Sequence, residues 1–173
     1  MTPEQNAYVK TLKTREEIFD YVESHLKNQG QRSIHLSGDL ARFDGSPAAL
    51  RLLVDAACAY RGEGGTMCAV GCLLADDEYD PGMEGCAVDE LADPDELCAG
   101  LDDDCDGCIN CLASSTTISP GFPDRLIPHR RMLADLQGLH DRVSSWSSSG
   151  KGLSSQGISR LRELRQEWLK DSN

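Results

Sequence analysis

The chain has 173 residues, of which 39% are hydrophobic and 5% aromatic. This size and composition suit one small domain whose core is built from aliphatic side chains. The net charge of −12 is concentrated in one block: no Lys or Arg occurs from Gly62 to Asp124, and fifteen acidic residues lie between Glu63 and Asp106. Such a block repels phosphate backbones and anionic membranes, so we expect neither direct nucleic-acid binding nor membrane attachment. We expect instead a partner protein with a basic surface.

The N-terminal residues MTPEQNAYVKTL contain no apolar run of the kind found in a signal peptide. No segment approaches the roughly 18 consecutive apolar residues of a membrane-spanning helix. We therefore expect a cytoplasmic protein, whose thiols stay reduced. In that compartment, eight cysteines indicate metal binding more than a disulfide framework.

Two helices are predicted in the first third of the chain. The T-x-x-E pattern that begins at Thr14 is typical of a capping box, and it predicts a helix over 14–29 that stops at Gly30. The Ser-Pro pair at 46–47 is typical of a helix start. The apolar run AALRLLVDAACAY after it predicts a second, largely buried helix over 47–60.

The segment that follows is open to two interpretations. A strand at TMCAVGCLL that pairs with CAYR across the GEGG turn would form a short β-hairpin over 58–72. Alternatively, the helical signal that starts at Ser46 carries through Tyr60. Beyond the hairpin, residues 75–112 are predicted to form an acidic, cysteine-rich insert, mainly loop, with one helical turn at AVDELA.

Two further helices are predicted, over 126–143 and 156–170, each with apolar residues at helical spacing. The Ser/Gly-rich SSWSSSGKG is expected to link them. The predicted fold is therefore mainly α-helical with a short β-hairpin, in one small domain over 1–173 that carries the acidic cysteine-rich loop insert.

The segment CAYRGEGGTMCAVGCLLADDEYDPGMEG (58–85) and the later LADLQGLHD (133–141) resemble short uncharacterised proteins encoded by phages and prophages. In those proteins a YRG…CAVG hairpin precedes an acidic Y-x-P-x-M-E-G segment. The resemblance implies a small phage-encoded accessory protein in the cytoplasm of the host cell, and it implies no particular activity. The matching residues are Tyr60, Arg61, Gly62, Cys68, Ala69, Val70, Gly71, Tyr79, Pro81, Met83, Glu84 and Gly85.

The stretch ELCAGLDDDCDG (96–107) is similar to the metal-binding Cys-Asp repeat of bacterial surface proteins. That resemblance implies a disulfide between Cys98 and Cys105 and calcium bound by the aspartates. The chain departs from the family because it has one copy of the repeat, two added cysteines, and no acidic residues just after the glycine. The matching residues are Cys98, Gly100, Asp102, Asp104, Cys105, Asp106 and Gly107.

Two metals suit the chemistry of this stretch. Alternating aspartates before a glycine are typical of the opening of an EF-hand calcium loop, but Ala113 stands where such a loop needs a closing Glu. Four closely spaced cysteines can close a tetrahedral zinc site, and bound metal would supply folding free energy to a loop with few hydrophobic residues. We predict Zn²⁺, with Ca²⁺ as the alternative; an iron–sulfur cluster and a metal-free acidic loop are the other interpretations. The predicted zinc ligands are Cys98, Cys105, Cys108 and Cys111, and the calcium ligands would be Asp102, Asp104 and Asp106.

The sequence contains no P-loop, G-x-S-x-G motif or dinucleotide fingerprint. His140 is explained by a helix C-terminus, with a role as the base for a thiol nucleophile as the alternative. We therefore expect a non-enzymatic protein that binds a host protein, as an inhibitor of host defence whose carboxylates stand in for phosphates. The rival classes are a metal- or thiol-dependent enzyme and a structural protein of a virion or its assembly. The residues expected to contact the partner are Asp76, Asp77, Glu78, Tyr79, Asp80 and Glu84.

Overall fold

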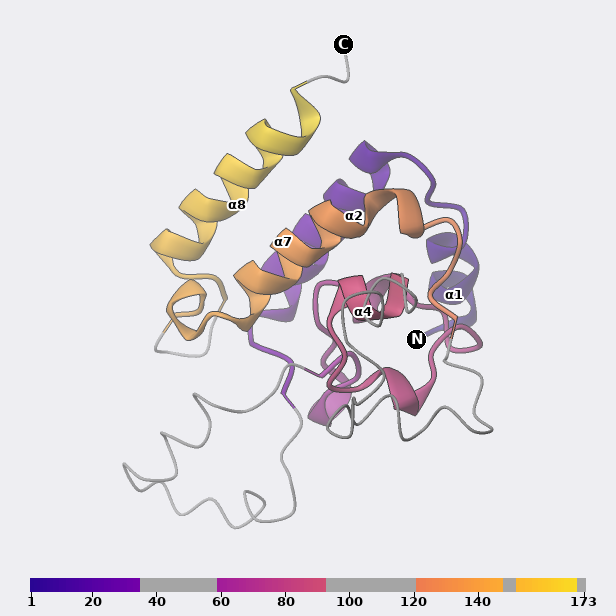
Figure 1. The fold of residues 1–173 in the computed structure, drawn as a ribbon. Helices are drawn as coiled ribbons and strands as arrows, with labels where there is room; N and C mark the ends of the chain where they lie inside the picture. The colour runs from indigo at the N-terminus through magenta and orange to yellow at the C-terminus, as the bar shows by residue number, and fades with distance from the viewer. Residues whose placement is uncertain (35–58, 93–120, 148–151, 171–173) are drawn as a thin grey trace, which may run out of the picture.

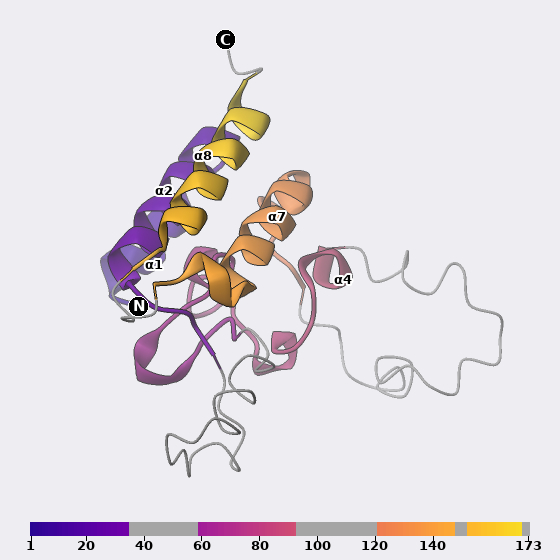
Figure 2. The same ribbon diagram turned by 90° about the vertical axis from the view of Figure 1, so that its left-hand side faces the viewer.

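Helix α8 packs against both α2 and α7, and these three helices lie side by side along one part of the molecule (Figure 1). The computed structural model describes residues 1–34, 59–92, 121–147 and 152–170. Figure 2 shows α7 between the α2–α8 pair and α4. The helices are α1 (Pro3–Val9), α2 (Arg15–Gln29), α4 (Val88–Ala92), α7 (Arg130–Asp141) and α8 (Ser155–Leu169). Short 3₁₀ turns cover Glu63–Gly65, Gly71–Leu73, Pro81–Met83, Ile127–His129 and Val143–Ser145.

None of the helices in these ranges is long and apolar enough to cross a membrane.

Helix α2 begins at a capping box. The Thr14 hydroxyl accepts a hydrogen bond from the Glu17 N–H at 3.2 Å, and the Glu17 carboxylate accepts one from the Thr14 N–H at 3.0 Å. The helix ends at Gly30, whose φ of 77° lies in the left-handed region that glycine adopts without steric cost. The helix expected over 14–29 therefore has both of its ends where the sequence pattern places them.

The helices expected over 126–143 and 156–170 are α7 and α8. Helix α7 starts only at Arg130, because the residues before it form a 3₁₀ turn that contains Pro128. Proline has no N–H to donate, so it suits the first turn and not the interior of a helix. Helix α8 begins after Ser154, whose hydroxyl accepts a hydrogen bond from the helix backbone at 3.1 Å.

The β-hairpin predicted over 58–72 is wrong. The described residues contain no β-strand, and Arg61 and Met67 share only an isolated antiparallel bridge. Side chains take the backbone groups that a ladder would use: the Gln29 side-chain oxygen accepts the Met67 N–H at 2.7 Å, and its NH₂ group donates to the Met67 carbonyl at 2.9 Å. The residues from Cys68 to Leu74 are buried by turning into the core rather than by pairing as a strand.

A close approach between Gly71 and Tyr60 fixes this turned conformation. A Cβ atom at position 71 would lie 1.9 Å from the Tyr60 carbonyl oxygen, so only glycine fits. The helix predicted over 47–60 lies outside the described residues except for Ala59 and Tyr60, and these two are not helical. The Ala59 N–H donates instead to the Ser33 carbonyl at 3.3 Å.

The predicted acidic insert is described as far as residue 92, and residues 93–112 lie outside the described ranges. Its first part contains the 3₁₀ turn over Pro81–Met83 and helix α4. Helix α4 lies within the AVDELA segment and packs against α7. Residues 75–92 are therefore attached to the helical core.

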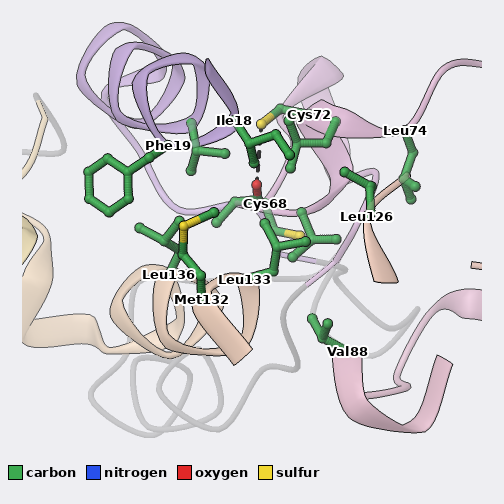
Figure 3. Close-up of a cluster of buried hydrophobic side chains, with 14 of the residues drawn as sticks. Ile18, Phe19, Cys68, Cys72, Leu74, Val88, Leu126, Met132, Leu133 and Leu136 are labelled. Atoms are coloured by element: carbon green, nitrogen blue, oxygen red, sulfur yellow. Dashed lines mark hydrogen bonds between the residues drawn. The ribbon is translucent and has the colours of Figure 1, made fainter. Parts of the chain in front are cut away.

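The core lies between α2, α7 and the turned segment 68–75 (Figure 3). Ile18 and Phe19 come from α2, and Met132, Leu133 and Leu136 come from α7; all are buried. They surround two further buried side chains, those of Cys68 and Cys72. Both thiols pack as small apolar groups.

Candidate functional site

Glu84 joins the two ends of the motif segment 60–85. One carboxylate oxygen accepts the Tyr60 N–H at 2.8 Å. The other accepts the Arg61 N–H at 2.9 Å and the Tyr79 hydroxyl at 2.8 Å. Because ionised acceptors form the stronger hydrogen bonds, this carboxylate ties three separate groups into one rigid unit. These hydrogen bonds of Glu84 serve the fold.

Arg61 fastens the same unit from the other side. Its guanidinium donates to the Leu74 carbonyl, forms an ion pair with Asp76 at 3.3 Å, and lies 5.3 Å from the centroid of the Tyr79 ring. Burial and the hydrogen bond to Glu84 raise the pKa of Tyr79 to about 12. The Tyr79 hydroxyl therefore stays protonated at neutral pH and acts as a donor rather than as a base.

Asp76 holds helix α1 against this unit. Its carboxylate accepts from the Asn6 side chain at 2.7 Å and lies 3.3 Å from the amine of Met1, while its N–H donates to the Asn6 oxygen at 2.7 Å. The hydrogen bond from Asn6 is the main cause that lowers the pKa of Asp76. Asp76 is exposed, but its polar contacts serve to dock α1.

Glu78 and Arg125 form the ion pair that attaches the segment 121–126 to the acidic segment. Their charged atoms are 2.6 Å apart, and the two side chains are only 21% and 14% exposed. The guanidinium also donates to the Leu73 carbonyl at 2.8 Å, and the Glu78 carboxylate accepts the Ala75 N–H at 2.9 Å. A half-buried pair with these extra hydrogen bonds keeps a defined geometry, unlike a typical surface ion pair.

An open hollow of about 570 Å³ lies where these two segments meet. We call it the acidic hollow. Asp77 on its edge is 70% exposed and pairs with Lys10 at 2.5 Å. Asp80 and Asp124 are also exposed, and within the described part of the chain neither forms an ion pair. The residues that line the acidic hollow are Asp77, Glu78, Tyr79, Asp80, Met83, Gly121, Pro123, Asp124 and Arg125.

The structure divides the six residues that we expected to contact a partner into two groups. Asp76 and Glu84 do not line the acidic hollow and serve internal contacts. The other four, Asp77, Glu78, Tyr79 and Asp80, do line it.

Two charged residues of the acidic hollow, Asp124 and Arg125, were not predicted from the sequence. Both lie far along the chain from residues 77–83. A signal for Arg125 was nevertheless present, because it is the first basic residue after the block that runs from Gly62 to Asp124 without Lys or Arg. A lone cation at the end of such a block is well placed to pair with one of its carboxylates.

The predicted metal ligands Cys98, Cys105, Cys108 and Cys111 lie outside the described residues, as do the alternative calcium ligands Asp102, Asp104 and Asp106. Within the described ranges, no group of three or more His, Cys, Asp or Glu side chains is placed to hold a metal ion. Burial raises the pKa of the Cys72 thiol well above its ordinary value, which disfavours the thiolate that a metal requires.

His140 is buried and has a structural environment. The Ser33 N–H donates to its Nε2 at 3.0 Å, so Nδ1 carries the proton and donates to Asp141 at 3.0 Å. The ring meets Trp146 edge to face at 5.4 Å. Burial lowers the pKa of His140, and its Nε2 lone pair is already used. This geometry joins the segment after α2 to the end of α7.

No protein-family model matches the chain, and comparisons with curated proteins and with solved structures find no match.

Proposed function

We propose that this protein acts by binding a partner protein that inserts basic side chains into the acidic hollow. We further propose that it is a phage or prophage accessory protein whose partner is a protein of the host, with host defence as the process that it inhibits. The observation that supports binding most directly is that exposed carboxylates lie on a segment whose conformation is fixed by internal contacts, namely those of Glu84 and Arg61 and the Glu78–Arg125 ion pair. The resemblance of residues 58–85 to phage and prophage proteins supports the biological setting.

These internal contacts support binding because they fix the positions of the Asp80 and Asp124 carboxylates before the partner binds. Glu84 and Arg61 lock the turn that carries Asp80, and the Glu78–Arg125 pair holds Asp124 beside it. Asp80 is further fixed because it accepts the Gly82 N–H at 2.7 Å. A preorganised array loses less conformational entropy on association than a mobile acidic loop would.

The chemistry of the acidic hollow favours Arg or Lys side chains from the partner. Asp80 and Asp124 offer carboxylates without a described counter-ion, and carboxylate geometry suits the fork of an arginine guanidinium. Pro123 and the ring of Tyr79, both partly exposed, add apolar surface on which the aliphatic part of such a side chain can pack.

A photo-crosslinking amino acid at position 80 tests the surface in the host cell, with the same residue at position 167 on α8 as the matched control. The partner captured from position 80 is then purified, and its affinity is measured by calorimetry at several salt concentrations. We expect a partner with a basic contact face, and affinity that falls as salt rises, because exposed charges are screened. We also expect D80N/D124N to weaken binding by roughly tenfold or more. Each lost charge-assisted contact contributes about 1.5–3 kcal/mol, and about 1.4 kcal/mol corresponds to a tenfold change in affinity.

The double variant E163Q/E167Q removes the same charge from α8 and is expected to leave affinity unchanged. Equal crosslinking from positions 80 and 167 would contradict the proposed surface. So would a partner whose affinity is insensitive to D80N/D124N.

A further inference from the structure

A second hollow, of about 410 Å³, lies where α7 begins, and its charge is opposite to that of the acidic hollow. We call it the basic hollow. The described residues that line it include three arginines and a histidine but no carboxylate. They come from the start of α2, the start of α7 and the end of α8. The lining residues are Arg15, Ile127, Pro128, His129, Arg130, Arg131, Met132 and Trp168.

The arginines of the basic hollow lack carboxylate partners within the described ranges. Arg130 and Arg131 form no ion pair there, whereas Arg61, Arg125 and Arg165 each pair with an acid. The Arg15 guanidinium donates to the Trp168 carbonyl at 3.3 Å and lies 5.5 Å from the centroid of the Trp168 ring. In a chain of net charge −12, acids were available to neutralise this group, and the fold places none in the lining.

The position of two of these arginines on α7 is also unfavourable for the helix itself. The first turn of a helix favours acidic residues, since the peptide dipoles give it partial positive charge. Helix α7 has no acidic residue there and carries Arg130 and Arg131 instead, without a capping side chain at His129. The Nδ1 nitrogen of the His129 ring is buried and has no hydrogen-bond partner among the described residues. Departures from the local rules of this kind are typical of functional sites.

We propose that the basic hollow binds a small phosphate monoester. A dianionic phosphate has three acceptor oxygens and can engage more than one guanidinium, whereas one carboxylate is satisfied by a single arginine fork. Ile127, Pro128 and the Trp168 ring supply an apolar wall for the organic part of the ligand. The bound anion would relieve the repulsion among the guanidiniums and offset the positive end of α7.

The charge of the whole chain favours a small ligand over nucleic acid. A long polyanion would meet the field of the acidic block as well as that of the basic hollow, whereas a small anion is governed by the charges within about one Debye length, roughly 8 Å at physiological salt. The volume of about 410 Å³ is that of a small-ligand pocket.

NMR of the two tryptophan indole N–H groups tests this proposal directly on the full chain. Trp168 lines the basic hollow, and its indole N–H donates to the Asp135 carboxylate at 2.9 Å. The Trp146 indole lies outside the lining, donates to the His140 carbonyl at 2.7 Å and serves as an internal control. Phenyl phosphate is titrated at constant ionic strength. We expect a saturable shift of the Trp168 signal, no shift of the Trp146 signal, and tighter binding of phenyl phosphate than of inorganic phosphate.

The R130Q/R131Q variant is expected to weaken binding of phenyl phosphate roughly tenfold or more. The matched control is R142Q/R162Q, which removes two exposed arginines outside the lining and should change affinity by less than about twofold. An absent or non-saturable Trp168 shift, or equal loss of affinity in the two variants, would overturn the proposal. Benzylmalonate binding as tightly as phenyl phosphate would reassign the basic hollow to carboxylates, and tighter binding of a single-stranded oligonucleotide would overturn the assignment to a small ligand.

Discussion

The Glu84 carboxylate accepts the backbone N–H of Arg61 at 2.9 Å, although the two residues are 23 positions apart. In this chain the contact joins the YRG residues at 60–62 to the MEG residues at 83–85. Arg61 keeps its bridge to Met67 while Glu84 takes its N–H, and the Arg61 guanidinium in turn covers Tyr79. The motif residues of segment 60–85 therefore stabilise the conformation that forms one side of the acidic hollow, and their contacts are structural rather than catalytic.

Replacement of Glu84 by Gln is expected to destabilise the protein by about 1–3 kcal/mol, because the amide loses the charge and offers one acceptor oxygen where the carboxylate uses two. Urea unfolding measures the change. The control is E163Q on α8, where an exposed pair with Arg160 is lost and the expected change is within about 0.5 kcal/mol. Equal midpoints for E84Q and the unsubstituted protein would contradict the role given to Glu84.

Gly71→Ala should destabilise the fold by roughly 2–3 kcal/mol or more, because the added methyl would overlap the Tyr60 carbonyl. Gly138→Ala gives a matched control of opposite sign. That glycine lies within α7, and a Cβ there would meet no atom within 4 Å, so alanine should stabilise the helix by about 0.5–1 kcal/mol. Thermal unfolding of both variants is the measurement. Similar small effects for the two would show that the turn at Gly71 can rearrange.

The helices were predictable because their signals are local. Thr14 and Glu17 cap α2 within a single turn, and Gly30 ends it through its own backbone conformation. The segment 60–72 was not predictable in the same way, because side chains far along the chain bind part of its backbone. Gln29 bonds the backbone of Met67, and Glu84 bonds that of Arg61. The hydrophobic pattern within 58–72 contains no sign of these two long-range contacts.

The same distinction applies to the two hollows. The acidic side of the first was visible as a block of charge, but the pairing of Glu78 with Arg125 joins residues 47 positions apart. The basic hollow was missed because Arg15, Arg130 and Trp168 belong to three helices that meet only in the folded chain. Its one local sign was the Arg-Arg pair after Pro128, where a helix start would ordinarily carry acids.

Purified without added metal, the protein is expected to contain one zinc ion per chain by elemental analysis, held by Cys98, Cys105, Cys108 and Cys111. Chelation should then release four thiols to a reagent such as DTNB. Cys68 and Cys72 are buried and should react only on unfolding, since burial raises the pKa of Cys72.

The variant C105S/C108S should lose the zinc, whereas C86S, at a partly exposed cysteine, should retain it. Calcium without zinc would instead favour the aspartate site. Absence of both metals, with the four thiols reactive from the start, would contradict the metal-ordered loop.

Stability should fall as the pH drops from 7 to 5, with His140 as a main cause. Its pKa is lowered from 6.5 by burial, so the folded protein favours the neutral ring that accepts the Ser33 N–H. A lowered pKa gives stability that is complete above about pH 6.5 and is lost as the pH falls toward the folded-state pKa. Burial lowers the pKa of His25 also, whereas Asp76 and Asp77 stay ionised in this range because their pKa values are lowered. The urea midpoint should decline less steeply with falling pH for H140Q than for the unsubstituted protein, although H140Q is less stable at pH 7. Equal slopes for the two proteins would assign the decline to other groups.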